Sequence, residues 1–293
     1  MTHLQLGQDA YSPREIAEKV QVIGVNKARL PFPQTAMLGV VAGGFISLGA
    51  LFYTLVASDA ALSFAQARVL GGLVFSLGLI LVVVAGAELF TGNNLMVMAW
   101  AERKISSTEL LRNWVIVYLA NALGAFGLVL VVYLSNHGAM NGGAVAAAYV
   151  KIAAAKTALP FAEAFFKGVL CNLLVCLAVW IAMAGHTVTD KILAIVLPIA
   201  AFVAAGFEHC IANMYFIPLG MLLAPAAPPA GLDWAGFVSN LVPVTLGNIA
   251  GGSVMVALVY YVVYRRLALA APRTGTERTR ASDPPDAGTT PPR

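Results

Sequence analysis

The chain has little charge and few cysteines. Only 11% of its 293 residues are charged, 59% are hydrophobic, and the mean hydropathy is +0.81. Soluble domains contain roughly 25% charged residues, so this composition excludes an ordinary soluble protein. The cysteines, Cys171, Cys176 and Cys210, lie in apolar segments without the spacing of a metal or redox site. We therefore read them as small core residues and expect no metal and no cofactor.

A cleavable signal peptide is not expected either. Residues 1–33 carry charged side chains, among them Arg14, Glu15 and Lys27, before any apolar run begins. Six apolar stretches follow, near residues 37–56, 70–85, 114–134, 165–183, 192–205 and 241–264. Each reaches or approaches the roughly 20 residues that cross a bilayer, or continues beyond an interruption. The sequence predicts an all-α membrane protein with six transmembrane helices.

The basic residues predict how these helices are oriented. Fourteen of the 18 lysines and arginines fall in segments on the same side as the N-terminus. Cytoplasmic loops of membrane proteins are enriched in such residues, so both termini are expected in the cytoplasm, with the helices in a bacterial inner membrane. The same distribution accounts for the net charge of +4, and we expect no nucleic-acid partner.

Three regions follow from these patterns. Residues 1–33 form a cytoplasmic segment in which Ser12, Pro13 and Glu15 predict the start of a short amphipathic helix. We interpret this helix as a membrane-surface anchor in preference to a gate. Residues 34–266 form the transmembrane domain, and residues 267–293, rich in proline and polar residues, are expected to be disordered.

An internal repeat divides the transmembrane domain into halves at about residues 34–135 and 159–266. The second and fifth apolar stretches share Ala85/Ala205, Gly86/Gly206, Glu88/Glu208 and Asn93/Asn213, each pair 120 residues apart. The third and sixth share an Asn-x-x-Gly pattern, Asn121/Gly124 and Asn248/Gly251, 127 residues apart. Three crossings per half force the two halves into opposite orientations, with a solute path between them.

Polar residues interrupt the second and fifth helices at matching places. The stretches 86–94 and 206–213 predict two broken helices, whose ends would bring amide N–H groups to the middle of the bilayer. Such amides and positive helix ends favour an anion. Thr91 and His209 lie at these breaks. In the alternative interpretation, Thr91 is only an N-cap and His209 is only a packed core residue. Ionisable residues within membranes are usually functional, so we favour a pore.

Three further charged residues lie near these breaks or near the predicted outer mouth. Glu88 and Glu208 would oppose an anion, so we interpret them as structural, accepting hydrogen bonds from the amides freed at their own breaks. Lys156 lies at the predicted outer mouth, where it either attracts anions or belongs to a solvated loop.

At these breaks the chain resembles the formate/nitrite transporter family. The family's signatures occur in order as AELFT at 87–91, KGVLCNLLVCLAVW at 167–180, GFEHCIANM at 206–214 and PVTLGNIAGG at 243–252. The likeness spans roughly residues 12–266. It implies an aquaporin-like protomer of two inverted three-helix repeats, assembled as a homopentamer with a pore through each subunit.

The resemblance also implies roles for single residues. It places His209 at the midplane facing Thr91, with Asn172, Glu208 and Lys156 in the surrounding polar set. It further implies two apolar constrictions, formed by Leu79, Leu89 and Val175 on the cytoplasmic side and by Phe75, Phe90 and Phe202 on the outer side. From the sequence alone each of these six apolar side chains is also compatible with ordinary helix packing, which is the commoner role of such residues.

The expected function is transport of small monovalent weak-acid anions, with formate favoured over nitrite. A proton-coupled symporter of the same anions stays open. An aquaporin is disfavoured because its Asn-Pro-Ala pairs are missing, and an intramembrane hydrolase because no Gly-x-Ser-Gly element precedes a helix. We expect no enzymatic activity.

Overall fold

The computed structural model describes residues 10–267, and this part of the chain contains helices and no strand. Six of its helical segments are long and apolar enough to cross a membrane, which confirms the predicted number. They are Phe32–Ala57, Phe64–Gly86, Ser107–Leu134, Phe161–Ala182, Val188–Ala205 and Trp234–Arg266. The predicted disordered tail lies outside the described residues, apart from Leu267.

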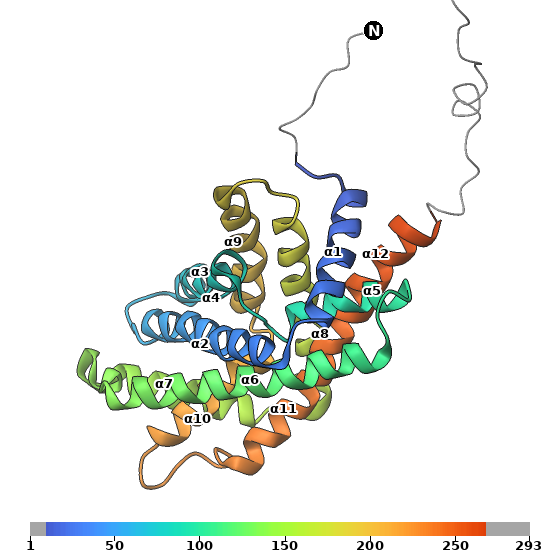
Figure 1. Ribbon diagram of the computed structural model, residues 1–293. Coiled ribbons are helices and arrows are strands. Elements are labelled where there is room, and N and C mark those ends of the chain that lie inside the picture. The colour runs from blue at the N-terminus through green and yellow to red at the C-terminus, as the bar shows by residue number, and fades with distance from the viewer. Residues whose placement is uncertain (1–9, 268–293) are drawn as a thin grey trace, which may run out of the picture.

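The chain order gives two similar sets of elements joined by short 3-10 turns. The first set is α1 (Pro13–Ala28), α2 (Phe32–Ala57), α3 (Phe64–Phe75), α4 (Leu77–Ile80), the π-helix η1 (Leu81–Gly86), the 3-10 helix η2 (Gly92–Met96), α5 (Val97–Ala101) and α6 (Ser107–Leu134). The turns are η3 (His137–Ala139) and η4 (Asn141–Gly143). The second set is α7 (Ala144–Thr157), α8 (Phe161–Ala182), α9 (Val188–Ala205), α10 (Cys210–Leu222), α11 (Trp234–Ile249), the π-helix η5 (Ala250–Leu258), α12 (Val259–Tyr261) and the π-helix η6 (Val262–Arg266). The helices α1 and α12 lie at one end of the molecule and α7 at the opposite end (Figure 1).

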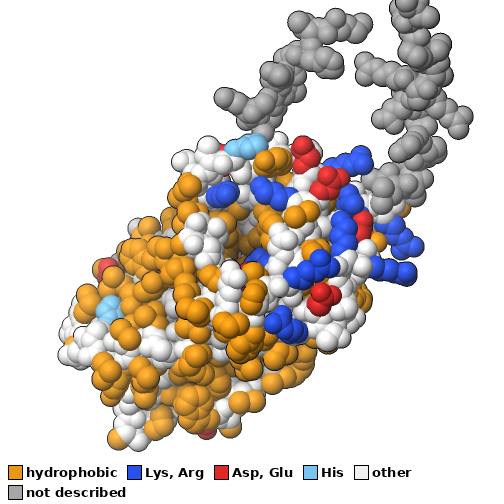
Figure 2. Space-filling view, in the orientation of Figure 1, with side chains coloured by type: hydrophobic (Ala, Val, Ile, Leu, Met, Phe, Trp, Pro, Cys, Tyr) orange, Lys and Arg blue, Asp and Glu red, His pale blue; other side chains and the backbone are white. Residues whose placement is uncertain are grey.

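The surface is divided in the way that a membrane protein requires. Lysine and arginine side chains gather at the end that carries α1 and α12, and hydrophobic side chains cover the body (Figure 2). On α6, for example, Leu111, Val115, Leu119 and Leu123 are all exposed. Such a surface is stable only against lipid or another apolar protein surface.

Glycines let the helices of each half approach closely. A Cβ on Gly124 of α6 would lie 1.9 Å from the carbonyl oxygen of Val40 on α2. In the other half, a Cβ on Gly251 would lie 2.2 Å from the carbonyl oxygen of Val169 on α8. These contacts explain the glycine of the repeated Asn-x-x-Gly pattern, because only glycine allows the two backbones to meet.

Two asparagines hold the helix breaks. Asn121 accepts a hydrogen bond from the Phe90 amide at 2.9 Å and donates to the Glu88 and Gly39 carbonyls at 2.9 and 2.7 Å. Its side chain therefore ties the extended segment after η1 to α2. A polar backbone inside a bilayer needs such protein partners, because lipid supplies none.

Asn248 repeats this clamp at the second break. It accepts from the Cys210 amide at 2.9 Å and donates to the Glu208 and Gly168 carbonyls at 2.9 and 2.8 Å. The Glu88 and Glu208 carboxylates accept hydrogen bonds from lysine and asparagine side chains, so the prediction that they accept from the freed amides is wrong for both. Asparagine serves because one side chain carries both a donor and an acceptor.

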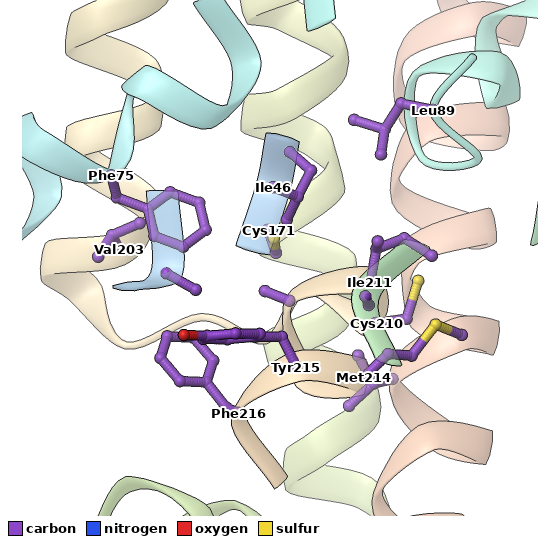
Figure 3. Close-up of a cluster of buried hydrophobic side chains, with 14 of the residues drawn as sticks. Ile46, Phe75, Leu89, Cys171, Val203, Cys210, Ile211, Met214, Tyr215 and Phe216 are labelled. Carbon is purple, nitrogen blue, oxygen red and sulfur yellow. The ribbon is translucent and has the colours of Figure 1, made fainter. Parts of the chain in front are cut away.

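Buried side chains from both halves, among them residues of α2, α3, the two breaks and α8–α10, form one hydrophobic core. Figure 3 shows Phe75 and Val203 facing each other, with Ile46 nearby and Leu89 at the far side of the cluster. This core surrounds the breaks, so it holds their ends in fixed positions.

The N-terminal helix α1 forms with the predicted capping box, in which Ser12 and Glu15 satisfy each other's backbone amides. The interpretation of α1 as a membrane-surface anchor is wrong, because the apolar face of α1 packs against other helices of the protein. Ile16, Ala17 and Val20 are buried in a cluster with residues of η2, α5 and α8. This packing places α1 beside the first break.

The close contact of α6 with α2 generates a stability prediction. Gly124→Ala adds a methyl group where no space exists, and we expect it to destabilise the protein by about 1–3 kcal/mol. Gly127, one turn further along the same helix, is the matched control, because a Cβ at this position would meet no neighbouring atom within 4 Å. The thermal unfolding midpoints of Gly124→Ala and Gly127→Ala are measured in detergent. Equal midpoints for the two variants would contradict the packing argument.

Candidate functional site

The two helix breaks bring Thr91 and His209 together. Thr91 Oγ1 and His209 Nε2 lie 3.0 Å apart although 118 positions separate the residues, and both side chains are buried. The Ala212 amide donates to His209 Nδ1 at 3.2 Å. Because Nδ1 accepts, the neutral ring carries its proton on Nε2, and this N–H points toward Thr91.

Asn172 lies behind this pair and does not line the cavities described below. Its amide donates to the carbonyl oxygens of Thr91 at 3.2 Å and Asn248 at 2.7 Å, and to Asn94 Oδ1 at 2.9 Å. Asn172 therefore links the first break to α11 and holds Thr91 in place. The resemblance implies that Asn172 belongs to the polar set around His209, and the contacts assign it this bracing position.

Two vestibules approach the Thr91–His209 pair from opposite ends. The α7 vestibule, a cavity of about 440 Å³, is lined by Arg68, Lys156, Phe202 and His209 among others. The α1 vestibule, of about 500 Å³, is lined by Lys19, Lys27, Leu79 and Leu89 among others.

An apolar constriction separates the vestibules. It holds a cavity of only about 10 Å³, lined by Ile46, Phe75, Leu79, Leu89, Val175, Ile199, Phe202 and His209. A single water needs roughly 10–15 Å³ of such space, so the constriction admits one water at most. A solute that passes here has lost nearly all its water, and His209 is the one ionisable side chain in this lining.

The aromatic residues of the predicted outer constriction divide into two groups. Phe75 and Phe202 pack edge to face at 5.7 Å between ring centroids, and the Phe202 ring stacks on His209 at 6.1 Å. Phe90 points away from the cavities described here, and its ring packs against Trp114 and Tyr118 of α6. The difference arises because regular helix is interrupted between η1 and η2, so the helical periodicity no longer decides which way the Phe90 side chain points.

A polar network of four residues lies beside the α1 vestibule. We call Lys27, Glu88, Asn93 and Asn113 the α1 network. Lys27 Nζ lies 2.7 Å from Glu88 Oε1 and 2.9 Å from Asn93 Oδ1. Asn93 donates to Glu88 Oε2 at 2.7 Å and to Asn113 Oδ1 at 2.9 Å, and Asn113 donates back to the Lys27 carbonyl at 3.2 Å.

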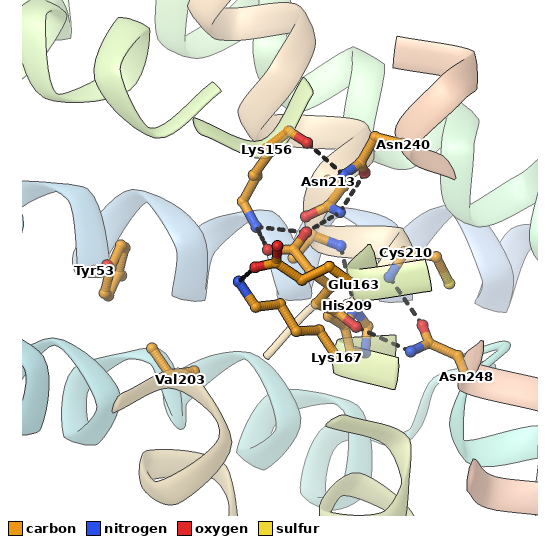
Figure 4. A network of polar contacts seen from close by, with 12 residues as sticks. Tyr53, Lys156, Glu163, Lys167, Val203, His209, Cys210, Asn213, Asn240 and Asn248 are labelled. Atoms are coloured by element: carbon orange, nitrogen blue, oxygen red, sulfur yellow. Dashed lines mark hydrogen bonds and ion pairs between the residues drawn. The ribbon is translucent and has the colours of Figure 1, made fainter. Parts of the chain in front are cut away.

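The α7 network, Lys156, Glu208, Asn213 and Asn240, repeats this arrangement at the other vestibule (Figure 4). Lys156 Nζ lies 2.9 and 3.1 Å from the two oxygens of Glu208. Asn213 donates to Glu208 and Asn240, both at 2.7 Å, and Asn240 donates to the Lys156 carbonyl at 2.8 Å. Both carboxylates thus face a lysine, and neither carries an uncompensated charge.

These networks extend the repeat beyond its predicted limits. Lys27 lies on α1 and Lys156 on α7, so each half begins one helix earlier than residues 34 and 159. The alternative of a solvated loop for Lys156 is wrong, since its side chain is 13% exposed and paired. The sequence pattern marks Lys27 only as a basic residue of the N-terminal segment. Its spacing of 129 residues from Lys156 is the signal that points to this role.

Three backbone amides at the breaks are already used within the protein. Side chains occupy those of Phe90, Cys210 and Ala212, through Asn121, Asn248 and His209. The prediction that break amides bind an anion is therefore wrong for these three and stays a prediction for the others. The polar side chain in the lining of the constriction is the imidazole of His209.

Comparisons with known proteins identify the family of this chain. The sequence profile of the formate/nitrite transporter family matches residues 14–262. The formate channel FocA of Escherichia coli K12 is 40% identical over 273 residues, which cover 88% of this chain and 96% of that protein. Formate channel FocA of Haemophilus influenzae is 38% identical over 270 residues, covering 87% and 95% of the two chains.

Solved structures show the same fold. A pentameric formate channel with formate bound superimposes with a TM-score of 0.73 at 37% identity and covers 80% of this chain and 97% of its own. An FNT family ion channel superimposes with a TM-score of 0.77 at 29% identity, covering 85% and 98%. The chain is a multi-pass membrane protein that belongs to the formate/nitrite transporter family, a family of transporters and channels and not of enzymes.

Proposed function

We propose that this protein conducts small monovalent weak-acid anions, and formate in particular, through a path inside each protomer. The observation that carries the proposal is the Thr91–His209 contact at 3.0 Å. It lies beside the apolar constriction between the α1 vestibule and the α7 vestibule. Formate is favoured because the relatives at 40% and 38% identity are formate channels.

The proposed mechanism follows from the cost of dehydration. A bare anion is unstable in a constriction lined by Phe75, Phe202 and Leu79, since these side chains offer no hydrogen bond to replace those of its water. The Nε2–H of His209, which points toward Thr91 in this structure, would supply one hydrogen bond at this point when the anion takes the place of Thr91 as its acceptor. A weak acid that also takes up a proton crosses the apolar part as a neutral molecule, which removes most of the dehydration cost.

We also propose an orientation and an assembly. Lysine and arginine side chains gather at the α1 end. In a bacterial inner membrane this end would face the cytoplasm, and the α7 vestibule would face outward. A homopentamer is proposed because a similar solved channel is pentameric and because the described surface of α6 carries exposed leucines.

Stopped-flow flux into proteoliposomes tests the substrate. Formate, nitrite, lactate and hydrosulfide are compared over a range of pH, with protein-free vesicles as the baseline. Formate flux well above that baseline and above the other anions supports the proposal. If nitrite flux is faster than formate flux, nitrite is the substrate instead. If formate accumulates against its gradient and a protonophore abolishes this accumulation, the protein is a proton-coupled symporter.

His209 is expected to be needed for this flux. His209→Phe removes the one polar donor at the constriction, and we expect formate flux to fall at least about tenfold, or its substrate preference to change, because the anion loses a hydrogen bond of about 1.5–3 kcal/mol. His137→Phe is the matched control, because His137 lies in the α7-end turn η3 outside both vestibules. Unchanged formate and nitrite flux in His209→Phe at every pH would contradict this role.

The two phenylalanine environments generate a second prediction. Phe202→Leu shortens a side chain in the constriction, and we expect faster flux and weaker discrimination between formate and lactate. Phe90→Leu removes a similar volume behind the path, so its flux should stay within about twofold of the wild type while its stability falls by about 1–2 kcal/mol. The same proteoliposome assay measures both, and a larger change in flux for Phe90→Leu would put Phe90 back in the constriction.

A further inference from the structure

The charges around the α7 vestibule leave one cation without an acidic partner. Lys156 is paired with Glu208 at 2.9 Å, and Lys167 is paired with Glu163 at 2.7 Å. Arg68 also lines this vestibule, and no carboxylate of the described residues lies within ion-pair distance of it. The positive charge of the vestibule therefore comes from Arg68, and the two lysines are neutralised where they lie.

Arg68 is held by neutral groups at the end of α9. Its Nε donates to the Ala204 carbonyl at 2.8 Å, its Nη2 to the Val203 carbonyl at 2.9 Å, and its Nη1 to the Tyr53 hydroxyl at 3.2 Å. Figure 4 shows Tyr53 and Val203 to one side of the α7 network. Three of the five guanidinium N–H groups are used, so one on each Nη atom stays available to another acceptor.

Arg68 lies at the C-terminal end of helix α9. Helix α9 stops at Gly206, three residues before His209, and its last carbonyl oxygens carry a partial negative charge of about −0.5 at the vestibule wall. An anion on its way to His209 would meet this negative end. Arg68 caps the carbonyls and adds a full positive charge, which reverses the sign of the local field.

Within residues 10–267, the other half of the protein has no such residue. The repeat offset of 120 residues places Val188 opposite Arg68, and Val188 is exposed on the outside of α9. Among the described residues that line the α1 vestibule, the cations without an ion pair are Lys19 and Lys191, and no described residue caps the end of η1 as Arg68 caps α9. The two ends of the path therefore attract anions by different residues.

We propose that Arg68 is the anion-attracting residue of the α7 vestibule and holds a permeating carboxylate before it reaches the Phe75–Phe202 pair. This inference rests on the proposed function, because it assumes that an anion enters. In this proposal Lys156 has a different role, because it neutralises Glu208 inside the α7 network. Arg68 is a binding residue at the mouth of the path and makes no contact with the His209 ring.

The test removes the charge of Arg68 and measures flux at two salt concentrations. Formate and nitrite flux are recorded at about 0.01 M and about 1 M ionic strength, where the Debye length is about 30 Å and about 3 Å. For Arg68→Gln we expect a loss of about tenfold at low salt, the lower end of what a focused charge contributes to an encounter rate, and a much smaller loss at high salt. A purely structural role of Arg68 would give a loss that does not depend on salt.

Three control variants separate charge from folding. Arg68→Lys keeps the charge and should retain most of the flux, and Tyr53→Phe removes one partner of Arg68 without changing its charge and should do the same. Lys151→Gln removes an equal charge from the exposed face of α7, outside the vestibule, and should leave flux unchanged. Gel filtration in detergent verifies that each variant assembles like the wild type.

Each outcome has one meaning. Salt-dependent loss in Arg68→Gln alone supports the inference. Equal flux of Arg68→Gln and wild type at low salt, an equal loss in Lys151→Gln, or a loss that salt does not reduce would overturn it and leave the proposed function standing. A wild-type protein that moves neither formate nor nitrite above protein-free vesicles would overturn the proposed function and this inference with it.

Discussion

The rest of the structure depends on satisfying the polar backbone where two membrane helices are broken. Lipid offers no hydrogen-bond partner to freed amides and carbonyls, so each break needs a protein side chain that both donates and accepts. Asn121 and Asn248 fill this need with nearly identical distances. Once the breaks are held, Thr91 and His209 lie 3.0 Å apart between the vestibules. The proposed path depends on this placement of the broken ends.

A second constraint is charge balance inside the membrane. A buried carboxylate without a partner is costly, and each half pairs it with a lysine from its first helix, α1 or α7, and with a pair of asparagines. The same solution appears at both ends because the halves share their topology. It also explains how two glutamates can lie beside the proposed anion path without repelling an anion. The vestibule cations that have no ion pair among the described residues, Arg68 at one end and Lys19 and Lys191 at the other, then set the field that a solute meets.

Much of this arrangement was predictable and some of it was not. Helix number, the two breaks and the repeated Asn-x-x-Gly pattern follow from hydropathy and spacing, because lipid imposes length and composition on every span. Phe90 could not be placed, since the direction of a side chain beside a break depends on one backbone conformation. The packing of α1 on the protein could not be foreseen either, because an amphipathic face looks the same whether it meets lipid or protein.

The sequence by itself determined that this is a membrane protein of two inverted halves with polar interruptions at Thr91 and His209, because repeats and apolar runs are local properties of the chain. Only the tertiary structure decided which side chains do what at those interruptions. Hydrogen-bond partners such as Lys27 and Glu88, or Arg68 and Val203 at the end of α9, lie 61 and 135 residues apart in the chain. Such pairs form only when helices from distant parts of the chain pack together, so the distance along the sequence between two partners does not by itself reveal that they pair.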